Sequence, residues 1–231
     1  MKTIGLIGGM SWESSLEYYR IINEDVRERL GGLHSAKILM YSFDFAEIEN
    51  LQRQGKWEKA AQLVVDAARR LEMAGADFLM LCTNTMHKVA DTVEKSVEIP
   101  LLHIADAVAQ AIKARNFKKV GLLGTRFTME EDFYTNRLLS KHGVAVIVPD
   151  LEDRRIVNDT IYNELCLGMI GRASKETLGA IIQALGAKGA EGVILGCTEL
   201  GLLIKQQDCE VPLFDSTSIH AKTAVDFALG E

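Results

Sequence analysis

The sequence lacks the patterns of a disulfide scaffold, a metal site or a membrane span. The four cysteines, Cys82, Cys166, Cys197 and Cys209, show no CxxC spacing, which argues against a disulfide framework and a cysteine zinc site. The 5 histidines have no second ligand at helical or hairpin spacing, so we expect no metal ion. No segment approaches the roughly 20 apolar residues of a membrane span, and the initial MKTIGLIGG is typical of a first strand rather than a signal peptide. We therefore expect a cytoplasmic protein without a membrane partner.

Clustered positive charge is also missing. The 26 lysines and arginines are scattered and the formal net charge is −6, which argues against a nucleic-acid partner. With 231 residues, of which 48% are hydrophobic, the chain can form one large or two small globular domains.

Short apolar runs alternate with longer amphipathic stretches. The runs predict strands at 3–7, 36–42, 77–82, 100–103, 119–124, 144–148, 192–196 and 212–215. Helical patterns occupy 13–30, 56–74, 106–115, 129–142 and 174–188, and the stretch after Asp215 is helical as well. This alternation predicts an α/β fold with parallel sheets.

The second half of the chain resembles the first. TIGLIGG at 3–9 matches KVGLLGT at 119–125, GADFLMLCTNT at 75–85 matches GAEGVILGCTE at 189–199, and IPLLH at 99–103 matches VPLFD at 211–215. The matches keep the same order, with offsets of 116, 114 and 112 residues between their first positions. Although any two strand-helix units share apolar strands followed by small residues, this order favours a true repeat.

The repeat predicts two similar lobes, each a short parallel sheet flanked by helices. We expect the lobes to be related by a pseudo-two-fold axis with the active site between them, because ligands of open α/β sheets bind beyond the carboxyl ends of the strands. The helix after Asp215 would return to the first lobe. The expected domains are residues 1–104 plus 216–231 for the first lobe and residues 105–215 for the second.

Cys197 is the strongest candidate for chemistry. In VILGCTELGLL a buried strand ends at Gly196, so that Cys197 would be the first residue past the carboxyl edge, and Thr198 and Glu199 follow at a helix start. A thiol at a helix N-terminus gains from the positive potential there, which favours the thiolate. The alternative is a small buried hydrophobic residue, but the polar neighbours favour function.

The equivalent segment of the first half is LMLCTNTMHK. The repeat pairs Thr83 with Cys197 and Cys82 with Gly196. Since neighbouring residues at a strand end point to opposite sides, a Thr83 that faces the site leaves Cys82 packed against the sheet. Asn84 and Thr85 either offer polar groups to a ligand or cap the following helix.

The glycine turn GLIGGM, residues 5–10, follows the first strand. It lacks the G-x-G-x-x-G spacing of dinucleotide sites. The turn either lets backbone N–H groups approach a carboxylate at a helix start or only connects the strand tightly to the helix.

These segments together resemble the aspartate/glutamate racemase family, which includes hydantoin racemase and arylmalonate decarboxylase relatives. The resemblance extends from GLIGGM through GADFLMLCTNT to VILGCTEL and VPLFD, and GCTEL is the most specific segment. It implies two α/β lobes, no pyridoxal phosphate or other cofactor, and two cysteines that flank the substrate α-carbon. Cys197 falls on the second of these cysteines, whereas Thr83 replaces the first.

The resemblance also implies a substrate site. We expect the amino acid to contact Met10, Gln52, Asn84, Thr85, Thr125, Thr198 and Glu199. Related aspartate racemases hold the distal carboxylate with charged residues. Here the corresponding segments offer Gln52, Arg53 and Lys56 in the first half and Glu164 and Cys166 in the second, and we favour Gln52 by position.

The function implied is a cofactor-independent racemase of aspartate or glutamate that prefers L-substrates. Cys197 would abstract the α-proton, and the Thr83 side would return one, because a threonine hydroxyl is too weakly acidic to serve as a good base. The alternatives are a single-thiol decarboxylase, a maleate-type isomerase, and a non-catalytic protein that binds an amino acid. A homodimer is compatible with this interpretation.

Overall fold

The computed structural model describes residues 1–230, and they form two compact units. Unit 1 comprises Met1–His103 and the segment from His220 onward, and unit 2 comprises Ile104–Ile219. The chain thus passes from unit 1 to unit 2 and returns. Within residues 1–230, no helix is both long and apolar enough to cross a membrane.

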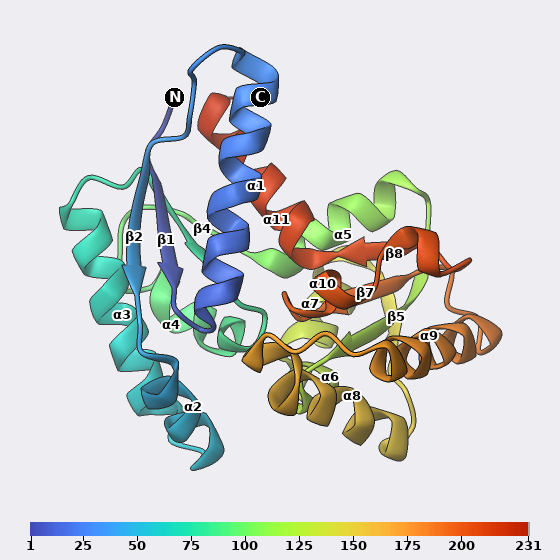
Figure 1. Cartoon of the computed structure of the whole chain (residues 1–231). Helices are drawn as coiled ribbons and strands as arrows, with labels where there is room; N and C mark the ends of the chain where they lie inside the picture. Colours follow the sequence, from blue (N-terminus) through green and yellow to red (C-terminus); the bar gives the residue numbers. More distant parts are fainter. Residues whose placement is uncertain (231) are drawn as a thin grey trace. The chain divides into compact units, whose positions relative to one another are not determined.

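Unit 1 contains a four-stranded parallel sheet with helices on both faces (Figure 1). Its strands are β1 (Ile4–Gly8), β2 (Ile38–Ser42), β3 (Phe78–Leu81) and β4 (Leu101–Leu102), in the order β2-β1-β3-β4. Its helices are α1 (Trp12–Leu30), α2 (Phe45–Arg53), α3 (Trp57–Met73), the 3-10 helix η1 (Thr85–Val89) and α4 (Ala90–Glu94).

Unit 2 has the same arrangement of strands. They are β5 (Lys119–Gly124), β6 (Ala145–Ile147), β7 (Val193–Gly196) and β8 (Leu213–Asp215), in the order β6-β5-β7-β8. The helices are α5 (Ile104–Ala114), α6 (Arg126–Glu130), α7 (Asp132–His142), α8 (Leu151–Asn163), η2 (Leu165–Leu167), α9 (Arg172–Ala187), α10 (Leu200–Leu203) and η3 (Gln206–Asp208). Helix α11 (Ser216–Leu229) begins in unit 2 and ends in unit 1.

The strand registers reproduce the sequence repeat residue by residue. Gly5 pairs with Leu79 in unit 1, and Gly121 pairs with Val193 in unit 2, which are the positions that offsets of 116 and 114 relate. Leu79 also pairs with Leu101, as Val193 pairs with Leu213. The predicted fold of two similar α/β lobes with short parallel sheets is therefore confirmed.

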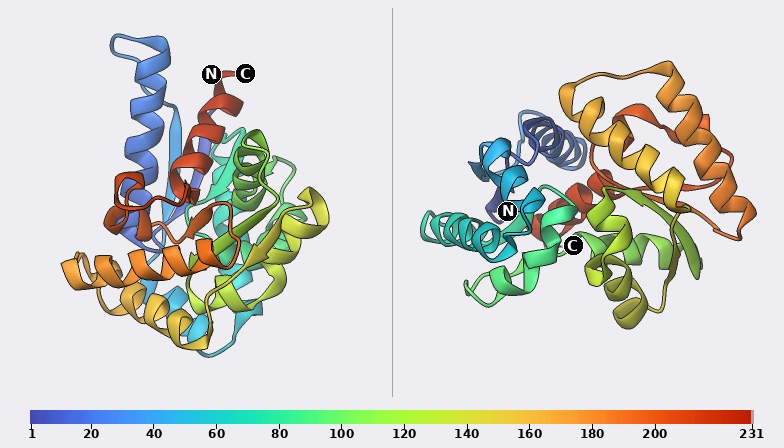
Figure 2. Two further views of the ribbon diagram at one scale, coloured as in Figure 1. Left: turned by 90° about the vertical axis from the view of Figure 1, so that its right-hand side faces the viewer. Right: turned by 90° about the horizontal axis from the view of Figure 1, so that it is seen from below.

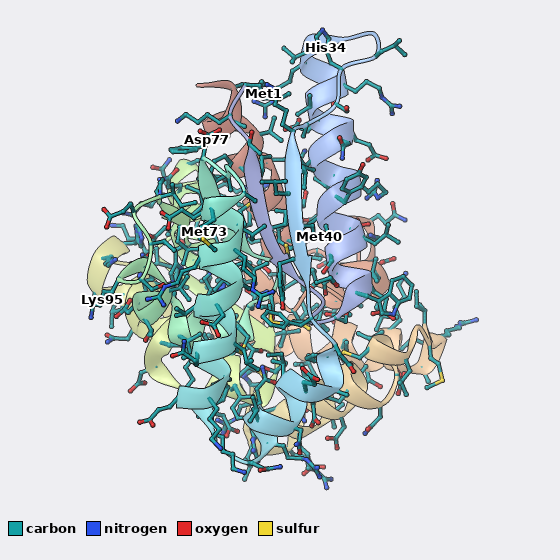
Figure 3. The ribbon with its side chains drawn as sticks, turned by 90° about the vertical axis from the view of Figure 1, so that its left-hand side faces the viewer. Met1, His34, Met40, Met73, Asp77 and Lys95 are labelled. Carbon is teal, nitrogen blue, oxygen red and sulfur yellow. The ribbon has the colours of Figure 1, made fainter. Side chains whose placement is uncertain are left out.

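A carboxylate supports the first strand at the same place in each unit. Asp77 accepts a hydrogen bond from the Thr3 N–H at 2.5 Å, and Glu191 accepts from the Lys119 N–H at 2.8 Å. Asp77 lies at the end of the sheet near Met1 (Figure 3). Both acids come just before a buried strand. The repeat therefore extends to the polar residues that hold the starts of β1 and β5.

Alternation along the strands divides each sheet into two apolar faces. In unit 1, Leu79 and Leu81 point toward α2 and α3, whereas Phe78 and Met80 point toward α1 and α11. Figure 1 shows α1 and α3 on opposite sides of β1. In unit 2, Leu195 packs on the side of α8 and α9, and the opposite face packs on α5 and α7. Continuous burial on both faces is what a parallel sheet covered by helices requires.

Three helical features differ from the sequence prediction. The helix expected at 129–142 is split, because Glu131 adopts an extended conformation with φ −100° and ψ 151° between α6 and α7. Helices α2 and α8 were not predicted. Only Ile48 and Gln52 of α2, and only Val157, Thr160 and Ile161 of α8, are buried, so their apolar faces are too narrow to give a strong periodic signal.

An ion-pair cluster in unit 2 gives a testable contribution to stability. Asp106 accepts hydrogen bonds from Arg137 Nε at 2.7 Å, Arg137 Nη2 at 2.6 Å and His142 Nε2 at 2.8 Å. Partial burial alone would raise the pKa of Asp106, but the hydrogen bonds from Arg137 and His142 outweigh it and lower the pKa to about 2. The unfolded value is about 3.9. A carboxyl with a depressed folded pKa stabilises the fold above the unfolded pKa, and this contribution is lost as the pH falls from about 4 through about 2.

We therefore expect Asp106→Asn to destabilise the protein by roughly 1–3 kcal/mol at pH 7. The measurement is urea unfolding of the variant and the wild type at pH 7, 4 and 2.5. The difference in the free energy of unfolding between the two proteins should become smaller at acid pH. Glu152→Gln is the control, because Glu152 pairs with Arg155 at the surface, where the two side chains are 67% and 68% exposed, and such pairs contribute little. An Asp106→Asn difference that stays constant with pH would contradict the assignment.

Candidate active site

The carboxyl ends of β3 and β7 present the two equivalent residues that the repeat singled out. Cys197 continues the row of Val193 and Leu195 past the end of β7, and it packs in the same apolar cluster with an exposed fraction of 8%. Thr83 follows Leu79 and Leu81 of β3 at the same alternation, and it is also 8% exposed. Both side chains are therefore largely withdrawn from water at the end of a sheet where α/β proteins bind ligands.

Cys197 has a carboxylate as its immediate partner. Its Sγ lies 3.0 Å from Glu199 Oε2, as donor to the carboxylate, and Glu199 is only 3% exposed. A second thiol is also near, since Cys166 Sγ lies 3.9 Å from Glu199 Oε1. This neighbour of Cys197 was not predicted, because Cys166 was considered only for the distal carboxylate and no local sequence pattern links it to Cys197.

The expectation of a thiolate stabilised by a helix N-terminus is wrong. Burial raises the pKa of the Cys197 thiol well above its ordinary value, and the neighbouring charges of Glu199 and Cys166 raise it further. The helix that follows, α10, has only 4 residues, and the field of a helix dipole grows with the number of aligned peptide groups. The resting group is thus a protonated thiol that is hydrogen-bonded to Glu199.

Cys82 lies on the opposite side of the β3 end from Thr83. It is fully buried in the apolar cluster beneath α1 and α11, together with Tyr18, Ile22 and Met80. Burial alone raises the pKa of its thiol. This environment is that of a small packing residue.

We expect Cys82→Ala to lower kcat/KM by no more than about threefold, through packing alone, with a stability loss of about 1 kcal/mol. Steady-state kinetics together with a urea unfolding curve measure both quantities. A loss of activity as deep as that of a Cys197 variant would show that Cys82, and not Thr83, is the reactive member of the pair.

Of the first-half residues considered for the distal carboxylate, only Gln52 is buried. Gln52 lies on the inner face of α2 and is 4% exposed, whereas Arg53 and Lys56 are exposed. Its Nε2 lies 3.0 Å from Met86 Sδ, and its Oε1 is buried without a hydrogen-bond partner. An unsatisfied buried amide oxygen costs free energy, so this side chain is poised for a further polar contact.

The other residues expected at the site lie at strand ends and are buried. Asn84 is the N-cap of η1 but makes no side-chain capping bond there, which removes the capping interpretation for that helix. Thr125 caps α6, where its hydroxyl accepts from the Thr128 N–H at 3.4 Å. The remaining members are also at most 7% exposed: Met10, Thr85 and Thr198. In unit 2, Glu164 accepts a hydrogen bond from Ser174 at 2.5 Å.

The glycine turn after β1 is shaped by close packing of the backbone. Gly9 has φ +79°, and a Cβ there would meet the backbone N and O of Phe43 at 2.3 Å. Its N–H donates to Ser15 Oγ at 2.7 Å. The Gly9 N–H is thus used within the turn, which favours the connecting role over direct contact with a carboxylate.

A cavity of about 560 Å³ lies in unit 2 beside α6 and α8. Its charged lining contains three basic and three acidic side chains, namely Arg126, Arg154, Arg155, Glu130, Glu152 and Asp159. Because these charges balance, the cavity has no evident preference for an anionic ligand.

Comparison with known proteins points to one family. Residues 7–224 match the family described as Asp/Glu/Hydantoin racemase. The chain is 26% identical over 171 residues to the broad specificity amino-acid racemase RacX of Bacillus subtilis. The aligned region covers 73% of this chain and 72% of RacX.

Two crystal structures are similar over almost the full length. A candidate Asp/Glu racemase from Yersinia pestis is 57% identical, with a TM-score of 0.93 and coverage of 99% of this chain and 100% of that one. PH1733 from Pyrococcus horikoshii, an aspartate racemase homologue, is 40% identical, with a TM-score of 0.86 and the same coverage of both chains. The resemblance found in the sequence is thereby confirmed.

Proposed function

The chain belongs to the Asp/Glu/hydantoin racemase family, and from that premise we propose that it is a cofactor-independent racemase of aspartate or glutamate. The single observation that carries the proposal is the buried Cys197 thiol, which donates to the Glu199 carboxylate at the carboxyl end of β7. A thiol with an adjacent buried base is the arrangement that nucleophilic and proton-transfer enzymes use to generate a thiolate.

Glu199 supplies the step that burial of Cys197 would otherwise prevent. Loss of the thiol proton to water would leave a second negative charge in a buried site, which is costly. Transfer of that proton to Glu199 Oε2, 3.0 Å away, leaves one negative charge before and after the transfer. The thiolate of Cys197 then takes the α-proton of the L-amino acid, and the electron pair of the C–H bond remains on the substrate as a carbanion.

Thr83 completes the reaction from the opposite face of the α-carbon. Its hydroxyl donates a proton to the carbanion, which gives the D-amino acid, and the resulting alkoxide takes a proton from water. Glu199 then releases the proton it received from the thiol to the hydroxide so formed, which restores the carboxylate, the thiol and the hydroxyl. Buried N–H and hydroxyl groups beside Thr83 would stabilise charge that develops on the α-carboxylate, as an oxyanion hole does. We assign this role to Asn84 and Thr85, which are 3% and 6% exposed.

Gln52 is our choice for the distal carboxylate. A half-turn of its amide exchanges Nε2 and Oε1, so the side chain can present a donor to a carboxylate or an acceptor to an ammonium group. Its burial, its unsatisfied amide oxygen and its contact with Met86 support a role in substrate binding. The remaining proposed contacts are Met10, Thr125, Thr198 and Glu199. That the protein is cytoplasmic, forms a homodimer and needs no cofactor stays a prediction.

The experiment that tests the proposal is α-proton exchange in deuterated water with a panel of L- and D-amino acids. Aspartate or glutamate should show deuterium at Cα together with the opposite enantiomer. Release of carbon dioxide from a malonate-type acid, without exchange of any amino acid, would instead identify a single-thiol decarboxylase. Isomerisation of maleate without exchange would identify a maleate-type isomerase. Binding without any proton transfer would identify an amino-acid-binding protein.

A further inference from the structure

A group of buried histidines lies in unit 1 and has no role in the proposed chemistry. His87, His103 and His220, here called the histidine stack, are 3%, 6% and 0% exposed. The ring centroids of His87 and His103 are 4.5 Å apart, and those of His87 and His220 are 5.8 Å apart. No set of three or more His, Cys, Asp or Glu side chains among residues 1–230 is arranged to hold a metal ion, so the stack has to be explained by its hydrogen bonds.

The hydrogen bonds of His220 fix its protonation. Its Nε2 lies 2.9 Å from the Leu102 carbonyl oxygen, which can only accept, so Nε2 carries the proton. Burial lowers the pKa of His220 to about 4, and at neutral pH the ring is uncharged. Nδ1 is then an acceptor, and the Tyr18 hydroxyl donates to it at 2.8 Å. His220 is thus a neutral, doubly hydrogen-bonded part of the core.

His87 connects this core to the proposed catalytic threonine. Its Nδ1 lies 2.8 Å from the Thr83 carbonyl oxygen, and since a carbonyl only accepts, Nδ1–H is the donor. Thr83 is the second residue after β3 ends at Leu81, and no strand partner is available to its carbonyl through the sheet. The imidazole therefore replaces the sheet hydrogen bond that would otherwise hold this backbone.

The stack also involves the two points at which the chain passes between the units. His103 is the last residue of unit 1 before the chain enters unit 2, and His220 is the first after it returns. The Thr83 backbone is therefore linked, through His87, to the residues at which the chain leaves unit 1 and returns to it.

We infer that His87 is a positioning residue, which holds Thr83 in the orientation needed to protonate the substrate carbanion. The inference rests on the proposed function. A displacement of a reacting group by about 1 Å commonly costs on the order of a hundredfold in rate, and a lost buried hydrogen bond at this backbone is sufficient for such a displacement. His87 acts only through Thr83, so the step at Cys197 is left largely intact.

The test compares two substitutions with one control. His87→Phe keeps a ring in the stack but removes the donor to Thr83. His87→Asn keeps a donor, because Nδ2 of asparagine occupies nearly the position of Nδ1 of histidine. His34→Phe is the control, since His34 is exposed in the loop that follows α1, as Figure 3 shows. Circular dichroism and urea unfolding check that each variant is folded.

The readout is the partition of L-substrate in deuterated water between deuterated L-isomer and D-isomer. Return of a deuteron from Cys197 gives the deuterated L-isomer, and delivery from the Thr83 side gives the D-isomer. We expect His87→Phe to lower formation of the D-isomer by at least about tenfold while exchange in the L-isomer stays within about threefold of wild type. His87→Asn and His34→Phe should keep the wild-type partition.

The outcomes separate the inference from the function it rests on. An unchanged partition in His87→Phe, or an equal loss of both products that His87→Asn does not repair, would overturn the role of His87. Absence of exchange in the wild type with every amino acid would overturn the proposed function instead. In that case nitrogen-15 spectra still report on the hydrogen bond itself, through a protected Nδ1–H signal of His87 and a carbonyl shift of Thr83 that changes in His87→Phe.

Discussion

Cys197→Ala is expected to reduce racemisation and α-proton exchange by several orders of magnitude while leaving the fold intact. The variant removes the only group in the proposed mechanism that can act as a strong enough base. Removal of a general base or nucleophile typically costs a factor of 10² to 10⁴ or more. Cys197→Ser should behave in the same way, because a serine hydroxyl is far less acidic than a thiol. The measurement is deuterium incorporation at Cα of L-aspartate and L-glutamate by NMR.

Cys209→Ala is the matched control for loss of a thiol. Cys209 is in the same unit but only part-buried, and it has no place in the proposed chemistry. The activity of Cys209→Ala should be close to that of the wild type. Retention of more than about a tenth of the activity in Cys197→Ala, which corresponds to a barrier change of less than ~1.4 kcal/mol, would rule out Cys197 as the base.

Thr83→Cys is expected to raise turnover of the D-enantiomer by tenfold or more, because it places a thiol on both faces of the α-carbon. In the wild type the L-enantiomer meets a thiol and the D-enantiomer meets a hydroxyl. An alcohol is a much poorer base precursor than a thiol, whose ordinary pKa is near 8.5. At saturating substrate the wild type should therefore turn over L-substrates much faster than D-substrates. Initial rates with each enantiomer, measured for both proteins, test this asymmetry.

Thermodynamics limits where the asymmetry can appear. Free enantiomers have equal free energies, so kcat/KM in the two directions must be equal and the final mixture must be one to one. The difference lies in kcat and KM separately and in rates of exchange. Thr83→Ser is a useful control, since it keeps the hydroxyl and should keep the wild-type asymmetry. Equal kcat values for the two enantiomers in the wild type, together with no change in Thr83→Cys, would refute the one-thiol mechanism.

The repeat made the topology predictable, whereas the local hydrophobic pattern predicted some helices and missed others. The match of 75–85 to 189–199 makes Thr83 and Cys197 equivalent positions of the repeat, and the strand registers have the same offsets. Helices α2 and α8 were missed because each buries only two or three side chains. The end of α6 at Glu131 was missed for another reason, since no glycine or proline marks it.

The hydrogen bonds and pKa values at the site were less predictable than the identity of its residues. Sequence placed Cys197 next to Glu199 but could not show that the carboxylate turns back to accept from the thiol. It therefore predicted a lowered thiol pKa where burial and Glu199 raise it. The histidine stack was not predicted either, because His87, His103 and His220 are distant in sequence and each alone resembles an ordinary core residue.

The way the chain leaves unit 1 and returns to it has a consequence for synthesis on the ribosome. The N–H of Lys2 donates to the carbonyl of Ala228, so the first residues of the chain lie beside the end of α11 in unit 1, and the left view of Figure 2 shows the two termini near each other. The core beneath β1 and β3 includes Ala221, Ala224 and Val225 of α11, which are synthesised after the whole of unit 2. Unit 2, by contrast, is one continuous segment. The first segment of unit 1 must therefore wait for α11 to close its core, and unit 2 can fold to completion before unit 1 during translation.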